Sequence, residues 1–209
     1  MLLLMLACVR HDTQATLTAA AEDAYPGLRP EVLSAALSSY RCARKEGFGS
    51  QRTLTIIDFE LPSTEKRLWV ISLRRGELLF HDYVSHGKNT GEDLATDFSN
   101  IVDSKQSSIG LFQTAETYTG KNGLSLRLDG LEPGVNDRAR ERYIVMHGAD
   151  YVSEAHIEEF GRLGRSWGCP AVPVEITADL IDRIDEGTLL FTWYPDQAWL
   201  DGSRFLSCP

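Results

Sequence analysis

The stretch Leu54-Thr-Ile-Ile-Asp-Phe59 marks the point where the hydrophobic pattern of this chain changes to a period of two residues. This alternation places successive side chains on opposite faces of a β-strand. Two stretches of the same character follow, Arg67–Leu73 and Glu77–Val84, and Arg74-Arg-Gly-Glu77 supplies the turn between them. These three segments predict the start of a β-meander.

Further strands and helices are predicted on both sides of this meander. Before it, apolar residues at helical spacing after Pro30 predict one amphipathic helix, which Gly47 and Gly49 end. After it, the polar segment Ser85–Ser108 predicts a long loop, and long ordered loops often carry function. The remaining patterns predict strands at Leu111–Tyr118, Leu124–Leu128, Tyr143–Met146 and Thr188–Tyr194, and helices at Asn136–Arg142, Ser153–Leu163 and Ile176–Ile184. The predicted fold class is mainly β with inserted helices, preceded by a short helical segment.

The composition fits one globular domain with a short appendage. Of 209 residues, 43% are apolar and 24% are charged, so the chain can bury a sizeable core. The formal net charge is −9, from 21 basic and 30 acidic residues. A chain this acidic is a poor general binder of nucleic acid or anionic lipid, although it can still contain a local basic pocket. We therefore expect no nucleic-acid partner.

The first residues, Met1-Leu-Leu-Leu-Met-Leu-Ala-Cys8, are apolar but much fewer than the ~20 that span a membrane. They are typical of the end of an export signal that is truncated at its start. Leu6-Ala7-Cys8 resembles the cleavage box of bacterial lipoproteins, in which the cysteine carries the lipid; the alternative is an apolar start with a chance cysteine. The expected organisation is a signal over 1–8, a helical lead over 9–49, a main domain over 50–196 and a tail over 197–209.

Cysteine spacing restricts the covalent and metal chemistry. The four cysteines contain no CxxC pair, so the chain does not predict a zinc ribbon or a thioredoxin-like motif. If the chain is exported, disulfides are permitted. Cys42 and Cys208 lie near the two ends of the predicted folded part. They either pair with one another or remain two free thiols.

The segment Ser166-Trp-Gly-Cys169-Pro has the features of a nucleophile turn. The thiolate is the reactive form of cysteine, so it needs a base or a positive charge nearby. His147 is the best candidate for the base, because it ends the predicted buried strand and is followed by Gly148. The alternative interpretations are a buried structural cysteine and a hydrogen-bonded core histidine.

Other residues of this turn are expected to assist the cysteine. The amides of Gly168 and Cys169 are predicted to face a developing oxyanion, where such donors contribute several kcal/mol. Ser166 either holds the loop or orients the imidazole, and Trp167 either packs the loop or lines the cleft. No acidic residue is marked by its position as a third catalytic member.

A metal site is a less favoured alternative for the same residues. His147, His156 and Cys169 could bind zinc, but their spacing matches no compact zinc pattern, so we expect neither metal nor cofactor. His81 and His86 lie in or just after a predicted strand, and we interpret both as structural or surface histidines.

Two motifs together resemble the catalytic domain of the L,D-transpeptidases. Tyr143-Ile-Val-Met-His-Gly148 followed by Ser166-Trp-Gly-Cys169 is similar to the family pattern of His-Gly, a spacer and Ser/Thr-x-Gly-Cys. Pro170-Ala-Val172 after the cysteine is similar to the murein L,D-transpeptidase branch. The resemblance extends from about Thr53 to Tyr194, including Ser107–Phe112 and Gly134–Ala139.

The resemblance implies an L,D-transpeptidase-like β-sandwich with Cys169 and His147 in one cleft. It implies attack by the cysteine on the bond after diaminopimelate in a peptidoglycan tetrapeptide stem, with release of the terminal D-Ala. The acyl-enzyme would then pass to the amine of another stem or to water. This activity needs no cofactor and belongs in the periplasm or cell envelope, with possible anchoring through lipidated Cys8.

Two rival functions use the same resemblance. The first is a hydrolytic L,D-carboxypeptidase or amidase with the same cysteine and histidine. The second is a non-catalytic peptidoglycan-binding module, which the intact Cys169 and His147 disfavour, because a binding module needs no thiol. The sequence leaves the oligomeric state open.

The chain departs from the family pattern after the cysteine. Many members carry Cys-x-Arg, whose arginine is thought to help hold the substrate carboxylate, whereas this chain has Pro170-Ala171. Arg138, Arg142 and Arg165 are candidate replacements, because a planar guanidinium suits a carboxylate. A surface charge is favoured for Arg138 and Arg165, whereas Arg142 lies beside the predicted histidine strand. Tyr151 either leans over the cleft or packs against the domain.

Overall fold

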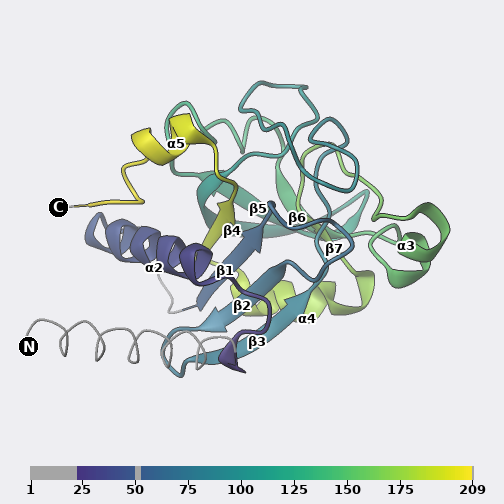
Figure 1. The fold of residues 1–209 in the computed structure, drawn as a ribbon, viewed down its shortest axis with the longest axis horizontal. Coiled ribbons are helices and arrows are strands. Elements are labelled where there is room, and N and C mark those ends of the chain that lie inside the picture. The colour runs from purple at the N-terminus through teal and green to yellow at the C-terminus, as the bar shows by residue number, and fades with distance from the viewer. Residues whose placement is uncertain (1–22, 50–52, 209) are drawn as a thin grey trace, which may run out of the picture.

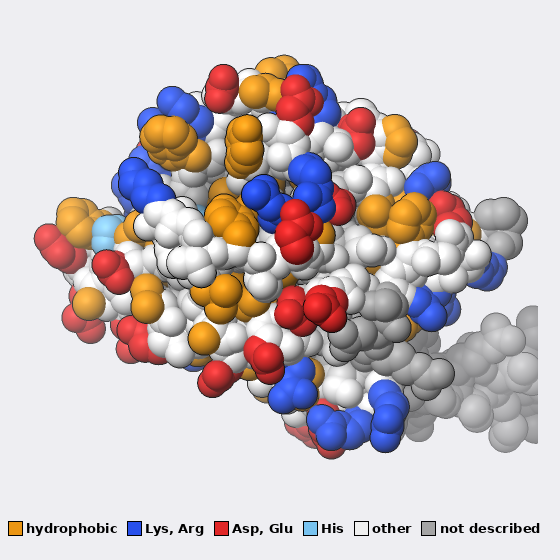
Figure 2. Space-filling view, turned by 180° about the vertical axis from the view of Figure 1, so that it is seen from behind, with side chains coloured by type: hydrophobic (Ala, Val, Ile, Leu, Met, Phe, Trp, Pro, Cys, Tyr) orange, Lys and Arg blue, Asp and Glu red, His pale blue; other side chains and the backbone are white. Residues whose placement is uncertain are grey.

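The computed structural model describes residues 23–49 and 53–208 (Figure 1). The predictions for the first eight residues, Cys8 included, lie outside this part of the chain. In the described ranges, no helix is long and apolar enough to cross a membrane. Acidic and basic side chains are interspersed on the face seen in Figure 2, with apolar side chains between them.

Eight strands form one sheet in the order β3-β2-β1-β8-β4-β5-β6-β7. Most neighbours are antiparallel, whereas β1 and β8 are parallel, as are β6 and β7. The strands are β1 (Thr53–Asp58), β2 (Leu68–Ser72), β3 (Glu77–Asp82), β4 (Gly110–Gly120), β5 (Gly123–Gly130), β6 (Val145–Gly148), β7 (Ala171–Val172) and β8 (Leu189–Trp193).

In the described part of the chain, four helices accompany the sheet: α2 (Pro30–Lys45), α3 (Glu154–Phe160), α4 (Val174–Ile184) and α5 (Gln197–Gly202). Pro30 occupies the first turn of α2, where its fixed φ and missing N–H are tolerated. Ser153 caps α3, because its hydroxyl accepts a hydrogen bond from the backbone of His156. Asp196 caps α5 in the same way through the backbone of Trp199.

The two faces of the sheet bury two separate cores. On β1, Ile57 contributes to the first core and Ile56 to the second, as the period of two requires. The first core is closed by α4 and also gathers residues of β2, β5 and β6, so distant strands of the sheet face one another across it. The second core is closed by α2 and α5 (Figure 1). This arrangement confirms the mainly β fold with a helical segment before it.

One predicted helix is wrong. Residues 136–142 form successive turns, because the side chain of Asn136 competes for backbone partners. Its amide accepts a hydrogen bond from Glu132 N at 2.9 Å and donates to Ile109 O at 2.9 Å. The segment ends at Tyr143, whose φ of 55° is left-handed and starts β6 in a new direction.

The segment predicted as a tail packs against the domain. It contains α5, and both Trp199 and Phe205 lie in the second core. A disulfide joins Cys208 to Cys42 on α2, with sulfur atoms 2.13 Å apart. Of the two alternatives for these cysteines, the structure therefore shows the paired one. The disulfide bond links the carboxyl-terminal segment to α2.

Candidate functional site

The loop that carries Cys169 is fixed by its own serine. Ser166 Oγ donates a hydrogen bond to Cys169 O at 2.6 Å and accepts one from Gly168 N at 3.0 Å. Ser107 Oγ donates to Gly168 O at 3.1 Å, which ties the loop to a segment 61 residues away. Ser166 therefore holds the loop, one of the two roles predicted for it.

Glycine is required at position 168 for conformational and steric reasons. Its φ of 121° is one that other residues rarely adopt, and a Cβ there would lie 2.6 Å from Gln106 O. The same geometry changes the oxyanion prediction. Because Gly168 N–H already donates to Ser166, it is not available as an oxyanion donor in this structure. The Cys169 amide alone carries that prediction.

The sulfur of Cys169 lies against the backbone that leads into β6. Val145 N donates to Cys169 Sγ at 3.5 Å, and the thiol faces Tyr143 O at 3.6 Å. Burial raises the pKa of the thiol above its ordinary value of 9.0, and this outweighs the lowering effects of the Val145 amide and the Arg142 charge. The resting cysteine is therefore a protonated thiol at neutral pH.

His147 lies on β6, which pairs with β7, the strand that directly follows the cysteine loop. It pairs with Ala171 of β7, two residues after Cys169. Its ring Nδ1 lies 2.9 Å from Gly148 O, so we assign the Nδ1–H tautomer, with Nε2 unprotonated. Burial lowers the pKa of the imidazole below its ordinary value of 6.5, and the Gly148 carbonyl only partly opposes this. No hydrogen bond joins this ring to Cys169 Sγ within the described residues.

Gly148 allows the histidine strand to approach α4 closely. A Cβ at this position would lie 2.5 Å from Thr177 Oγ1 on that helix. The Gly148 carbonyl at the same time accepts a hydrogen bond from the Nδ1–H of His147 in the assigned tautomer. A single residue thus fixes both the orientation of the base and the packing behind it.

Family membership follows from the sequence of the whole folded part. The sequence-family model of the L,D-transpeptidase catalytic domain matches residues 24–193 of this chain. The chain belongs to this family. No curated protein matches the sequence.

Solved structures that are similar to this member of the family include an L,D-transpeptidase from Mycobacterium smegmatis, at 15% identity and a TM-score of 0.42, over 68% of this chain and 59% of that chain. The helical cell shape determining protein Pgp2 from Campylobacter jejuni matches at 13% identity and a TM-score of 0.44, over 76% of this chain and 54% of that chain. An L,D-transpeptidase from Xylanimonas cellulosilytica matches at 14% identity and a TM-score of 0.38, over 76% of this chain and 77% of that chain. The chain thus spans less than two thirds of the first two relatives.

Arg142 is held in the loop next to the L,D-transpeptidase motif. Its guanidinium donates to Ser99 O and Ser108 Oγ through one nitrogen, and to Ser104 Oγ and Gln106 O through another. These four bonds bind the long 85–108 loop to the segment before β6. The positive charge of Arg142 also lowers the pKa of the Cys169 thiol, although less than burial raises it.

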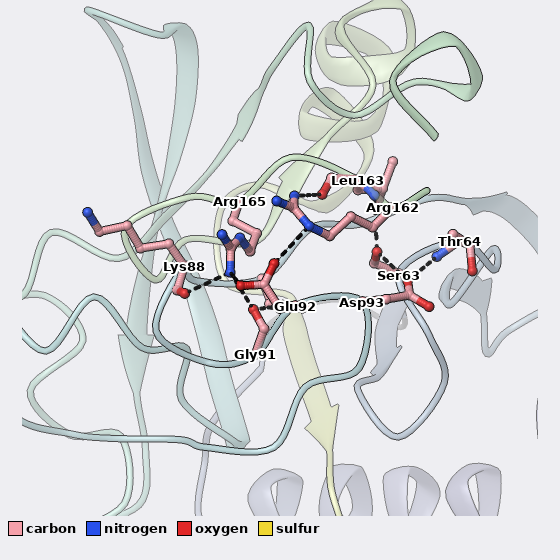
Figure 3. Close-up of polar contacts among 10 residues, drawn as sticks. Ser63, Thr64, Lys88, Gly91, Glu92, Asp93, Arg162, Leu163 and Arg165 are labelled. Carbon is pink, nitrogen blue, oxygen red and sulfur yellow. Dashed lines mark hydrogen bonds and ion pairs between the residues drawn. The ribbon is translucent and has the colours of Figure 1, made fainter. Parts of the chain in front are cut away.

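The other two candidate arginines are engaged elsewhere. Arg138 forms an ion pair with Glu141 at 2.9 Å on the surface. Arg165 pairs with Glu92 at 2.7 Å and donates to Gly91 O at 2.9 Å, and Arg162 pairs with the same Glu92 at 3.0 Å (Figure 3). Arg138 agrees with the surface-charge interpretation, whereas Arg165 is partly buried and ties the cysteine loop to the 85–108 loop.

Tyr151 is close enough to the nucleophile to interact with its charge. Burial, followed by the charge that Cys169 carries when it is ionised, raises the pKa of this phenol to about 12. The phenol is therefore protonated at neutral pH. Its backbone also accepts a hydrogen bond from Gly164 N at 2.8 Å, at the start of the cysteine loop.

The remaining histidines lie in packing environments. The His156 ring lies against Phe160, with centroids 4.4 Å apart, and His81 stacks on Trp69 at 5.1 Å. His86 is buried, its Nδ1 accepts a hydrogen bond from Arg67 at 2.8 Å, and burial lowers its pKa to about 4. Across the described ranges, no group of three His, Cys, Asp or Glu side chains could hold a metal ion.

Sequence patterns did not identify every residue that shapes this site. Ser107 supports Gly168 and also accepts a hydrogen bond from Gly87 N at 3.0 Å, and it was noticed only as part of the stretch Ser107–Phe112. The exposed, left-handed Tyr143 beside the thiol was also missed. A tyrosine directly before a buried strand gives no signal of a positive φ, because that conformation is set by tertiary contacts.

Proposed function

We propose that this chain is a cysteine acyltransferase that remodels peptidoglycan, with Cys169 as nucleophile and His147 as its base. The observation that carries the proposal is the contact of 2.9 Å between His147 Nδ1 and Gly148 O, from which we assign the tautomer. Its Nδ1–H is bound to Gly148 O, so the unprotonated Nε2 can accept a proton, and this ring stands on the strand adjacent to the cysteine loop. We assign this activity to residues 50–196 as the catalytic domain.

The proposed reaction begins with a neutral pair. His147 Nε2 takes the thiol proton as Cys169 Sγ attacks the diaminopimelate carbonyl carbon in the bond to the terminal D-Ala of a tetrapeptide stem. The Cys169 amide stabilises the oxyanion. The intermediate then expels the amine of the terminal D-Ala, which receives the proton from the imidazolium, and a thioester remains on the cysteine.

The second half of the reaction releases the acyl group. The amine of another stem attacks the thioester carbonyl, His147 takes its proton, and the thiolate leaves and is protonated again. Water in place of the amine gives the hydrolytic L,D-carboxypeptidase alternative at the same site. We place this activity at the cell wall, in the periplasm or cell envelope, with anchoring through a lipidated Cys8 as a separate proposal that intact-mass analysis of membrane-derived protein tests.

The mechanism predicts different defects for its two residues. Cys169→Ser should abolish acyl-enzyme formation, because a hydroxyl is a far weaker nucleophile. His147→Ala should slow acylation by about 10²–10⁴-fold, the usual contribution of a general base. His156→Ala is the matched control, because its ring packs on Phe160 and it should keep the wild-type rate.

The measurement is intact-protein mass spectrometry after mixing with a tetrapeptide stem, together with muropeptide analysis of the products. The expected adduct has the mass of the stem less D-Ala and maps to Cys169. Turnover at the wild-type rate by a folded Cys169→Ser variant would end the assignment. Unchanged acylation in His147→Ala would remove His147 from its role as base.

A further inference from the structure

An exposed aromatic side chain in the cysteine loop, Trp167, has no packing role that explains it. Trp167 is 72% exposed, although it lies between the buried Ser166 and the constrained Gly168. It stands two residues before Cys169 in a loop whose backbone is held by hydrogen bonds. A rigid loop that presents an indole to solvent provides a contact surface next to the reacting sulfur.

A lysine from the long loop lies over this indole. Lys105 Nζ is 5.0 Å from the centroid of the Trp167 ring, within the range of a cation–π interaction. Lys105 has a φ of 57°, an uncommon conformation for a residue other than glycine. Its carbonyl accepts a hydrogen bond from Asn89 N at 3.2 Å, and the next residue, Gln106, accepts one from Arg142. The loop therefore holds the lysine at this position through its backbone.

The ammonium of Lys105 is a cation without an acidic partner. The structure pairs it with no carboxylate among the residues that it describes. By contrast, Arg162 and Arg165 both pair with the carboxylate of Glu92 (Figure 3). Arg142 donates to four oxygen atoms of the loop. Lys88 of the same loop also forms no ion pair within the described ranges, but Lys105 is the lysine that lies over Trp167, two residues before Cys169. Lys105 therefore offers positive charge to a carboxylate that lies against this indole.

We infer that Trp167 and Lys105 form the receptor for the terminal carboxylate of the peptide stem, with the indole in contact with the peptide and the ammonium paired with the carboxylate. This inference rests on the proposed function for the identity of the stem. It also accounts for Pro170-Ala171, where many relatives carry an arginine, because the cation is supplied from the 85–108 loop. Lys105 and Trp167 then determine specificity, and neither takes part in proton transfer.

The test is a binding measurement that does not depend on turnover. Isothermal titration of full-length Cys169→Ser protein would compare a tetrapeptide stem with a free carboxyl terminus and the same stem with an amidated one. Lys105→Gln in this background should weaken binding of the free acid about tenfold, the loss of one charge-assisted hydrogen bond, and leave the amide unchanged. Lys105→Arg should restore the preference, and Trp167→Ala should weaken both peptides.

Lys66 provides the matched control, because its ammonium lies 5.5 Å from the centroid of the Tyr83 ring and also pairs with Asp82. Lys66→Gln should change neither dissociation constant. Equal weakening of both peptides by Lys105→Gln, or no binding of the stem at all, would overturn the inference. Lys105-dependent binding in a protein whose wild type never acylates would instead support the receptor and refute the proposed reaction.

Discussion

Replacing Ser166 by alanine should loosen the loop that carries Cys169 without removing either Cys169 or His147, the proposed catalytic pair. The hydroxyl makes two hydrogen bonds, to Cys169 O at 2.6 Å and from Gly168 N at 3.0 Å. Each such bond contributes about 0.5–1.5 kcal/mol net, so the pair contributes about 1–3 kcal/mol. We expect a loss of stability near the upper end of this range, because the substitution leaves the buried N–H of Gly168 without its hydrogen-bond acceptor.

For a chain of this size, that loss corresponds to a fall in Tm of about 2–12 °C. The same loop positions Cys169 Sγ and leads directly into β7, so acylation should slow by about 10–100-fold. Differential scanning calorimetry and stopped-flow acylation would measure the two effects. Ser166→Thr, which retains a hydroxyl, should recover most of both.

The reasoning has a specific point of failure. Ser166→Ala with a Tm within about 1 °C of wild type and an unchanged acylation rate would show that these hydrogen bonds do not hold the loop. A normal Tm with slow acylation would instead limit their effect to local order, which faster amide exchange at Gly168 would reveal.

Three further predictions concern pH, charge and crosslinking. Because burial lowers the pKa of His147 and raises that of Cys169, kcat/KM should stay level from neutral pH to about 9 and should fall in acid with a midpoint below pH 6.5; a loss of rate between pH 7 and 8 would contradict this. Arg142→Met should raise the pKa of the thiol further, seen as an alkaline shift in the pH dependence of iodoacetamide alkylation, and an unchanged profile would exclude the coupling. Cys42→Ser/Cys208→Ser should lower stability by about 5 kcal/mol in the chain-entropy model for a separation of 166 residues, or roughly 10–20 °C in Tm, and a reductant-insensitive wild-type Tm would argue against the bond.

The sequence predicted most of the sheet because its signal is local. Alternation at Leu54–Phe59 directly reports the two buried faces, which Ile56 and Ile57 occupy in the structure. The same reasoning failed for residues 136–142, where the pattern of side chains was compatible with a helix. There the amide of Asn136 binds backbone groups of strand β4 and the segment before it, and no local pattern encodes those partners.

The candidate site divides in the same way. Cys169 and His147 were found because glycine, strand end and spacing are all visible in the chain. Their supports were not, because Ser107 reaches Gly168 across 61 residues and Arg142 reaches Ser99 across 43. Long-range hydrogen bonds of this kind are determined by how the 85–108 loop folds back on the sheet, and a single sequence contains no measure of that path.

If the proposed function and cell-envelope location are correct, the neutral state of the pair has a consequence for the stability of the thiol. The Cys42–Cys208 disulfide uses two of the cysteines and leaves Cys169 as the free thiol of the described chain. Thiolates attack disulfides and are oxidised far more readily than thiols, so a resting thiolate would be at risk in an oxidising compartment. Burial raises the pKa of Cys169 and lowers that of His147, so both side chains are neutral at neutral pH. On the proposed mechanism, proton transfer to His147 would then accompany attack, so the same burial that slows oxidation restricts the nucleophile to bound substrate.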